Sequence, residues 1–135
     1  MNRYILDTNV LIDMKRGTSS VREGILQVGP ENCYVSSISI AELQTGYEIT
    51  KNEDELQNIN FCKERFKIIP VTEDILNTFA KMKAVQIRAG KKVPDFDLTI
   101  AATAKALNYT VVSHDEKHFS VIEGIKWEDW GTEFF

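Results

Sequence analysis

The sequence is poor in the features that stabilise secreted and membrane proteins. It has only two cysteines among 135 residues, Cys33 and Cys62, and no Cys-x-x-Cys pair. Both lie among apolar neighbours, so we expect buried free thiols in a reducing cytoplasm, with a single disulfide as the alternative. No apolar run has the length of a signal peptide or of a membrane-spanning helix. We therefore expect a cytoplasmic protein without a membrane partner.

Positive charge is also scarce. The formal net charge is −4 and the sequence pI is about 5.2, which argues against a broadly basic surface for nucleic acid. A local basic rim around an acidic pocket is still compatible with this balance. The chain has 43% hydrophobic residues and no internal repeat or linker-like tract. These features predict one globular domain over residues 1–135.

Short apolar runs alternate with longer segments of helical periodicity. The expected strands are 4–6, 33–36, 67–71 and 109–113, with an edge strand in 125–130; the expected helices are 9 onward, 20–28, 38–49, 52–66, 72–90 and 95–107. This alternation is typical of a three-layer α/β/α sandwich with a mostly parallel central sheet. In such folds ligands bind beyond the carboxyl ends of the strands.

Four acidic residues are predicted to lie at that edge of the sheet. Asp7 and Asp115 each follow a strand, and Glu42 and Asp97 fall in the first turns of helices that begin there. Carboxylates packed together disfavour one another's ionisation unless a cation neutralises them. Oxygen ligands without cysteine or histidine favour Mg²⁺, with Mn²⁺ as a substitute. Such an ion activates water for phosphodiester hydrolysis.

Each acid also has a purely structural interpretation. Asp7 could cap the first helix, and Asp115 could cap a short turn before His118. The spacing Ser39-x-x-Glu42 matches a capping box, in which Glu42 would bond to a backbone amide. For Glu42 taken alone, capping is the stronger interpretation.

Asp95 and Asp97 compete for one role. A helix is expected to start near Pro94, which would make Asp95 a plausible cap and place Asp97 in the first turn. Spacing alone does not decide which carboxylate faces the other acids.

Four segments together resemble the PIN-domain nucleases, and among them the VapC-like toxins of toxin–antitoxin pairs. The segments are "YILDTNVLID", "VSSISIAELQTG", "DFDLTIAATA" and "TVVSHDEKHF", and the resemblance extends from Arg3 to about Trp130. The first and third are fairly specific in combination, whereas the second and fourth are loose by themselves. The resemblance implies a PIN-like α/β/α fold over the chain.

The resemblance also implies which residues act. Asp7, Glu42, Asp97 and Asp115 would form the catalytic acidic site, with Asp7 and Asp97 holding Mg²⁺. It selects Asp97 over its neighbour as the ligand, and it leaves a supporting role open for Asp95. Asn9 matches the Asp-Thr-Asn opening of the family and would orient a carboxylate or a water molecule.

The activity implied is that of an endoribonuclease toxin, with RNA as substrate, a cognate VapB-like antitoxin and a homodimeric state. Neither histidine has the partner expected of a Ser-His or Cys-His pair, so we expect direct attack by water. We expect His114 to lie exposed in a turn. The alternative is a catalytically silent PIN-like binding module.

Two other phosphate-handling classes fit less well. A haloacid-dehalogenase-type phosphatase needs Asp-x-Asp, but Asn9 stands at the second position. A phospho-receiver domain needs a central Asp after its third strand, and Asp74 lies only at a helix start.

Overall fold

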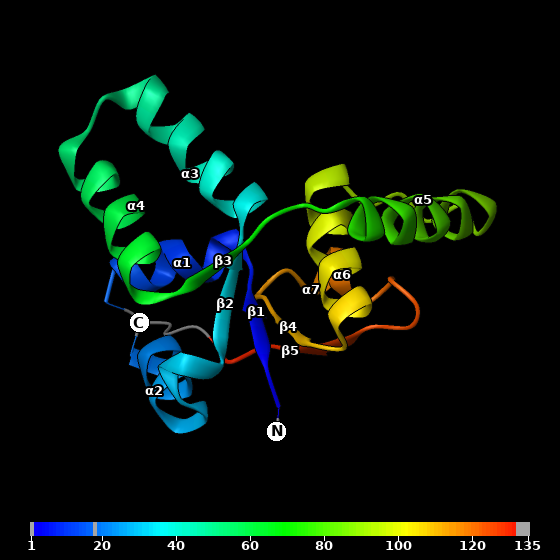
Figure 1. The fold of residues 1–135 in the computed structure, drawn as a ribbon, viewed down its shortest axis with the longest axis horizontal. Coiled ribbons are helices and arrows are strands. Elements are labelled where there is room, and N and C mark those ends of the chain that lie inside the picture. The colour runs from blue at the N-terminus through cyan, green and yellow to red at the C-terminus, as the bar shows by residue number, and fades with distance from the viewer. Residues whose placement is uncertain (1, 18, 132–135) are drawn as a thin grey trace.

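A five-stranded parallel sheet forms the centre of the computed structural model, which describes residues 2–17 and 19–131 (Figure 1). The strands are β1 (Tyr4–Leu6), β2 (Cys33–Ser36), β3 (Lys67–Ile69), β4 (Thr110–Val112) and β5 (Lys126–Glu128). Their order is β3-β2-β1-β4-β5, with every neighbouring pair parallel. The predicted edge strand is therefore confirmed as β5. The outermost residues of the predicted 1–135 domain, Met1 and 132–135, lie outside the described residues.

Helices follow the strands along the chain, as the periodicity predicts, except that the last of these helices occupies a segment where only a short turn was expected. They are α1 (Thr8–Lys15), α2 (Ser19–Val28), α3 (Ser37–Thr50), α4 (Glu53–Arg65), α5 (Glu73–Arg88), α6 (Asp95–Leu107) and α7 (Glu116–Phe119), with a short 3₁₀ turn η1 (Pro30–Asn32). Local signals set several ends: the Thr72 side chain caps α5 by accepting from the Ile75 amide, and Gly90 just beyond α5 has φ +69°.

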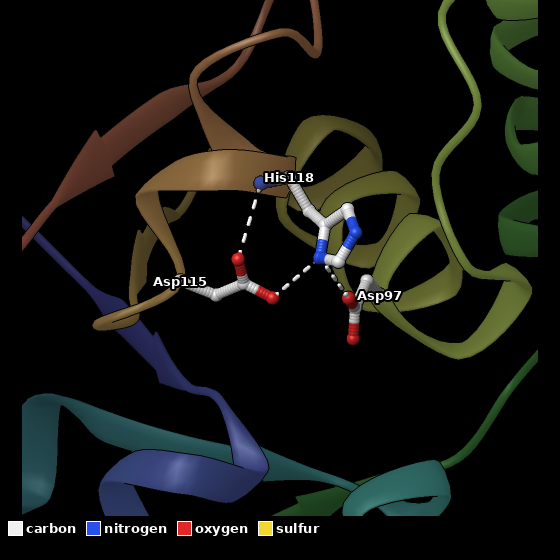
Figure 2. A group of neighbouring side chains, drawn as sticks. All are labelled: Asp97, Asp115 and His118. Atoms are coloured by element: carbon white, nitrogen blue, oxygen red, sulfur yellow. Dashed lines mark hydrogen bonds and ion pairs between the residues drawn. The ribbon is translucent and has the colours of Figure 1, made fainter.

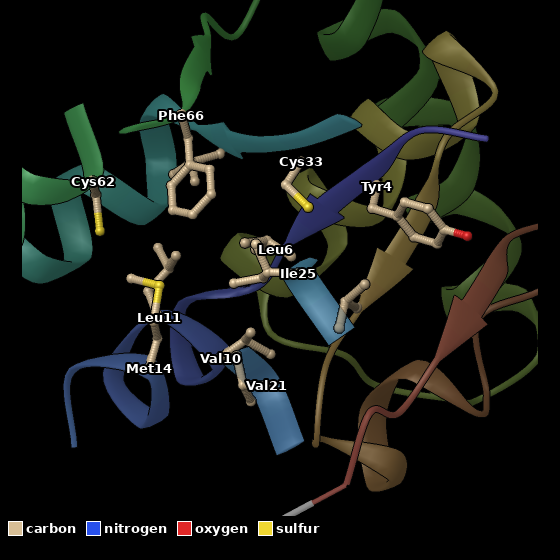
Figure 3. Close-up of a cluster of buried hydrophobic side chains, with 12 residues drawn as sticks. Tyr4, Leu6, Val10, Leu11, Met14, Val21, Ile25, Cys33, Cys62 and Phe66 are labelled. Atoms are coloured by element: carbon tan, nitrogen blue, oxygen red, sulfur yellow. The ribbon is translucent and has the colours of Figure 1, made fainter. Parts of the chain in front are cut away.

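The two faces of the sheet carry separate hydrophobic cores, because successive side chains of a strand point to opposite faces. In β1, Tyr4 and Leu6 pack with residues of α1, α2 and α4, whereas Ile5 packs with residues of α5 and α6. Figure 3 shows the first core, which also contains the buried free thiols of Cys33 and Cys62. The three-layer α/β/α prediction and the prediction of free thiols are confirmed.

The parallel arrangement brings the carboxyl ends of β1, β2 and β4 to one edge of the sheet. Helices α1 and α3 begin directly at this edge, and the turn after β4 leads into α7. Within the described part of the chain, no helix is both long and apolar enough to cross a membrane.

Candidate acidic site at the carboxyl edge of the sheet

Asp7 is the most deeply buried acid of the site. It follows β1, is 3% exposed, and its Oδ2 accepts a hydrogen bond from Ser113 Oγ at 2.8 Å. Its side chain makes no capping bond to α1, so the capping interpretation of Asp7 is wrong. The pKa of Asp7 is raised to about 6, mainly by burial. Hydrogen bonds from Ser113 and from the Thr8 backbone lower this pKa, and the charges of Asp97 and Glu42 raise it.

Glu42 faces α1 rather than the backbone of its own helix. Ser36 caps α3 by accepting from the Ile38 amide, so Ser39 lies inside the helix and the predicted capping box is wrong. Glu42 Oε1 instead accepts a hydrogen bond from Thr8 Oγ1 at 2.7 Å. This contact joins the first residue of α1 to α3 and fixes the carboxylate beside Asp7.

Asp97, Asp115 and His118 form the other side of the site (Figure 2). Asp115 Oδ1 caps α7 by accepting from the His118 amide at 3.1 Å, so the capping interpretation of Asp115 is confirmed. Its Oδ2 lies 2.6 Å from His118 Nδ1, and Asp97 Oδ2 lies 3.4 Å from the same nitrogen. Capping therefore uses one oxygen of Asp115 and leaves the other facing the cluster.

Asp97 connects the two sides of the site electrostatically. The pKa of Asp97 is raised to about 6, mainly by burial and also by the negative charges of Asp115 and Glu42, whereas His118 lowers it. Because Asp97 also raises the pKa of Asp7, Asp97 lies within interaction range of each of the other three predicted acids. Segments remote in the sequence therefore converge at one place, as predicted.

The two supporting candidates are placed differently. The Asp95 carboxylate is exposed and pairs with Lys83 Nζ at 2.9 Å, away from the acids around Asp97. Asn9 contacts the β4–α7 turn: its Nδ2 lies 3.5 Å from Ser113 Oγ, and its Oδ1 accepts from the His114 amide at 3.4 Å. Asn9 thus positions the turn that carries Ser113, the partner of Asp7, and Asp115.

Two contributors were not predicted from the sequence. Ser113 is fully buried and bonds to Asp7 while accepting from the Asp115 amide at 3.0 Å. His118 lies between two acids, and its spacing of three residues from Asp115 is the signal that could have indicated this.

The exposed turn position expected for His114 is wrong. Its side chain is 11% exposed and lies between two carboxylates, with Nε2 at 2.9 Å from Asp13 Oδ2 and Nδ1 at 2.8 Å from Asp129 Oδ1. His114 Nε2 makes no hydrogen bond despite its closeness to Asp13. The His114 ring therefore lies between α1 and the segment after β5, with its hydrogen bond on the Asp129 side.

The donor set fits a divalent cation. Carboxylate oxygens from Asp97 and Asp115 and the Nδ1 of His118 all lie within 4.8 Å of one another, and all three side chains are partly buried. The raised pKa values of Asp7 and Asp97 show that their charged forms are poorly compensated by the protein alone. Oxygen-rich sites of this kind suit Mg²⁺ and Mn²⁺.

The chain is similar in sequence and in fold to a single group of known proteins. The PIN-domain family model matches residues 4–124. Ribonuclease VapC1 of Haemophilus influenzae strain R2866 is 32% identical over 94% of this chain and 97% of its own length. The tRNA(fMet)-specific endonuclease VapC of Shigella flexneri is 28% identical over 96% of this chain and 99% of its own length. Among solved structures, VapBC2 of Rickettsia felis bound to a promoter DNA fragment superposes with a TM-score of 0.86, at 26% identity, covering 95% of this chain and 98% of the matched one.

Proposed function

Because the chain belongs to the PIN-domain family, and within it to the VapC group, we propose that it is a metal-dependent endoribonuclease. We propose further that it acts in the cytoplasm as the toxin of a toxin–antitoxin pair, through one PIN domain over residues 1–135. The observation that carries this proposal is the convergence of Asp7, Glu42, Asp97 and Asp115 at the carboxyl edge of the parallel sheet.

Asp7 and Asp97 would hold Mg²⁺, with Mn²⁺ as a substitute. When bound, the ion supplies Lewis acidity and neutralises charge on a phosphate oxygen. The protein supplies the rest of the site by positioning: Ser113 orients Asp7 through a 2.8 Å hydrogen bond, and Thr8 orients Glu42 through one of 2.7 Å. Asp115 completes the acidic wall from the start of α7.

Water is the nucleophile in this proposal. Among the described residues, both histidines face carboxylates: His114 faces Asp13 and Asp129, and His118 faces Asp97 and Asp115. Neither imidazole is paired with a serine or cysteine, as a nucleophilic dyad would require. We therefore expect direct attack by water on the phosphate, without a covalent enzyme intermediate.

RNA is the substrate that the relatives support, because they are named as ribonucleases and as a tRNA endonuclease. The partner would be a VapB-like antitoxin, as in the VapBC complexes among the structural neighbours. An acidic pocket is complementary to a basic side chain of such a partner, arginine above all. We also propose a homodimer, which light scattering of the purified protein would test.

The decisive experiment replaces single carboxylates by amides of the same shape. Asp7→Asn and Asp97→Asn should each abolish Mg²⁺-dependent cleavage of labelled RNA, and chelation of the metal should do the same to the wild type. Asp95→Asn is the matched control, because Asp95 lies in the same helix as Asp97 but pairs with Lys83. Undiminished cleavage by the folded Asp7→Asn/Asp97→Asn double variant would overturn the site assignment.

Growth of cells distinguishes the nuclease from a silent binding module. Expression of the wild type alone should arrest growth, and co-expression of the partner gene should relieve the arrest. Harmless accumulation of folded wild-type protein would favour the silent module. The Asp97→Asn variant is the control for toxicity that arises from expression alone.

A further inference from the structure

His118 differs from the other histidine in how its ring meets acidic side chains. At His114 each ring nitrogen faces a different carboxylate, Asp13 on one side and Asp129 on the other. At His118 a single nitrogen, Nδ1, faces two carboxylates that come from different helices. One N–H group points along one direction, so it cannot serve both acceptors well. A cation at this position would satisfy all three groups.

We propose that His118 is a nitrogen ligand of the metal site, and that the site therefore prefers Mn²⁺ over Mg²⁺. This inference rests on the proposed function, because it concerns the ion that the acidic residues would hold. In this assignment His118 Nδ1 and Asp115 join Asp7 and Asp97 of the proposed site as ligands of the ion, and the ring proton resides on Nε2.

The distances are compatible with shared coordination. Two adjacent ligands of an octahedral ion, each about 2.1 Å from the metal, are about 3 Å apart. Nδ1 lies 2.6 Å from Asp115 Oδ2 and 3.4 Å from Asp97 Oδ2, so the observed separations lie on either side of that value. Figure 2 shows the ring edge directed between the two carboxylates. The Asp97 and Asp115 oxygens of this group lie within 4.8 Å of each other, so one ion can be reached from both carboxylates.

The capping role of Asp115 does not explain the position of the His118 imidazole ring. Asp115 Oδ1 already accepts from the backbone amide of His118, which satisfies the start of α7. The side-chain contact to Oδ2 is therefore additional, and the nearby Asp97 belongs to α6. The approach of His118 to Asp97 thus links α7 to α6 and is not required by the helix cap.

Metal selectivity follows from the donor types. Mg²⁺ and Mn²⁺ both favour oxygen ligands, but Mn²⁺ is a transition-metal ion and binds an imidazole nitrogen more readily than the harder Mg²⁺ does. A site that adds one imidazole to these carboxylates should therefore bind Mn²⁺ more tightly than Mg²⁺. Loss of the imidazole should weaken Mn²⁺ binding by about 10-fold or more, a size found even for outer partners of metal ligands. Mg²⁺ binding should weaken less on loss of the imidazole, so the preference of the site for Mn²⁺ over Mg²⁺ should become smaller.

The test uses bound Mn²⁺ as a spectroscopic probe, without reference to RNA cleavage. Pulsed electron paramagnetic resonance of the Mn²⁺-loaded protein should show coupling to an imidazole nitrogen, and ¹⁵N labelling of histidine should change that coupling. The sequence contains two histidines, so two variants assign the signal. His118→Asn should lose the coupling, and His114→Asn should keep it. Calorimetric titrations with Mn²⁺ and Mg²⁺ measure the change in preference.

The outcomes separate this inference from the proposed function. Mn²⁺ binding that depends on Asp7 and Asp97 but shows no histidine coupling overturns the role of His118 alone. Absence of Mn²⁺ and Mg²⁺ binding overturns both. Coupling that persists in His118→Asn, or that disappears in His114→Asn, also overturns the assignment. If His118→Asn does not fold, His118→Gln replaces it, and the labelled wild type with His114→Asn still decides the question.

Discussion

Ser113 Oγ donates a 2.8 Å hydrogen bond to Oδ2 of Asp7, and this bond links the ends of the paired strands β1 and β4. Ser113 is fully buried and Asp7 is 3% exposed. The same hydroxyl oxygen accepts from the Asp115 amide at 3.0 Å. One small side chain therefore positions two of the four acids.

Ser113→Ala should weaken both stability and metal binding. Loss of a buried hydroxyl partner costs about 1–3 kcal/mol in the free energy of unfolding. The Ser113 hydrogen bond lowers the pKa of Asp7, so its removal should raise that pKa and weaken Mg²⁺ binding near neutral pH. Urea unfolding and calorimetry measure the two effects. Thr78→Ala is the control, because the exposed Thr78 hydroxyl bonds only within α5; equal effects of both variants would contradict the prediction.

The stability of the metal-free protein should fall as the pH rises from about 4 to 7. The pKa of Asp7 and that of Asp97 are both raised to about 6, whereas an unfolded aspartate titrates near ~3.9. In this window the folded state binds more protons than the unfolded state, so the free energy of unfolding decreases with pH.

Asp7→Asn should remove the contribution of Asp7 to this decrease. In the presence of a chelator, the free energy of unfolding of Asp7→Asn at pH 8 should exceed that of the wild type by up to roughly 3 kcal/mol. This is the equivalent of a shift of about two units in the pKa of one group. The difference should disappear near pH 4. Asp95→Asn, which removes an exposed carboxylate, should show no such gain. A wild type that gains stability relative to Asp7→Asn on raising the pH would refute this interpretation.

Thr8 should be needed for activity through Glu42. Thr8→Val keeps the shape but removes the hydroxyl that donates to Glu42 Oε1, and comparable losses around metal sites reduce activity by about 10-fold or more. Thr8→Ser keeps the hydroxyl and should retain most of the activity. The measurement is the initial rate of RNA cleavage, and equal rates for the two variants would exclude this role of Thr8.

Gly24 should be required for the docking of Trp130. A Cβ at Gly24 would lie 2.5 Å from Trp130 Cε3, and Trp130 also packs against Tyr4 with ring centroids 5.5 Å apart. Gly24→Ala should therefore displace the indole, cost about 1–3 kcal/mol and shift tryptophan emission to longer wavelength.

Gly46→Ala is the matched control for that substitution. Its Cβ would meet only the end of the Glu55 side chain, at 3.3 Å. Because alanine favours a helix over glycine by about 1 kcal/mol, Gly46→Ala should be neutral or stabilising. If both variants lost a comparable amount of stability, the effect of Gly24→Ala would come from replacing a helical glycine in general and not from the contact with Trp130.

The sequence predicts the placement of the acids better than it predicts their partners. Asp7 could be placed because it directly follows a recognisable apolar strand, and parallel strands share one edge. The Thr8–Glu42 bond joins residues 34 positions apart, and local spacing suggested a capping box instead. Helix α3 begins at Ser37, earlier than expected, because Ser36 is its N-cap residue. Only packing of α1 against α3 shows where Glu42 points.

The two histidines illustrate the same limit. The contact of His118 with Asp115 is local and could be inferred from spacing within a turn, but its contact with Asp97 needs the arrangement of α6 beside α7. His114 sits in a polar segment that suggests exposure. It is nearly buried because β5 brings Asp129 to one side of its ring, and the strand order that does so is not encoded in any short motif.

The pairing of β1 with β4 has a consequence for the order of events during translation. Asp7 is synthesised early, but its hydroxyl partner Ser113 and the acid Asp115 come more than a hundred residues later. A nascent chain on the ribosome therefore lacks a complete cluster until β4 has emerged and joined the sheet. The proposed nuclease would therefore be inactive during its synthesis. A co-produced antitoxin would be able to bind it as soon as the acidic cluster is complete.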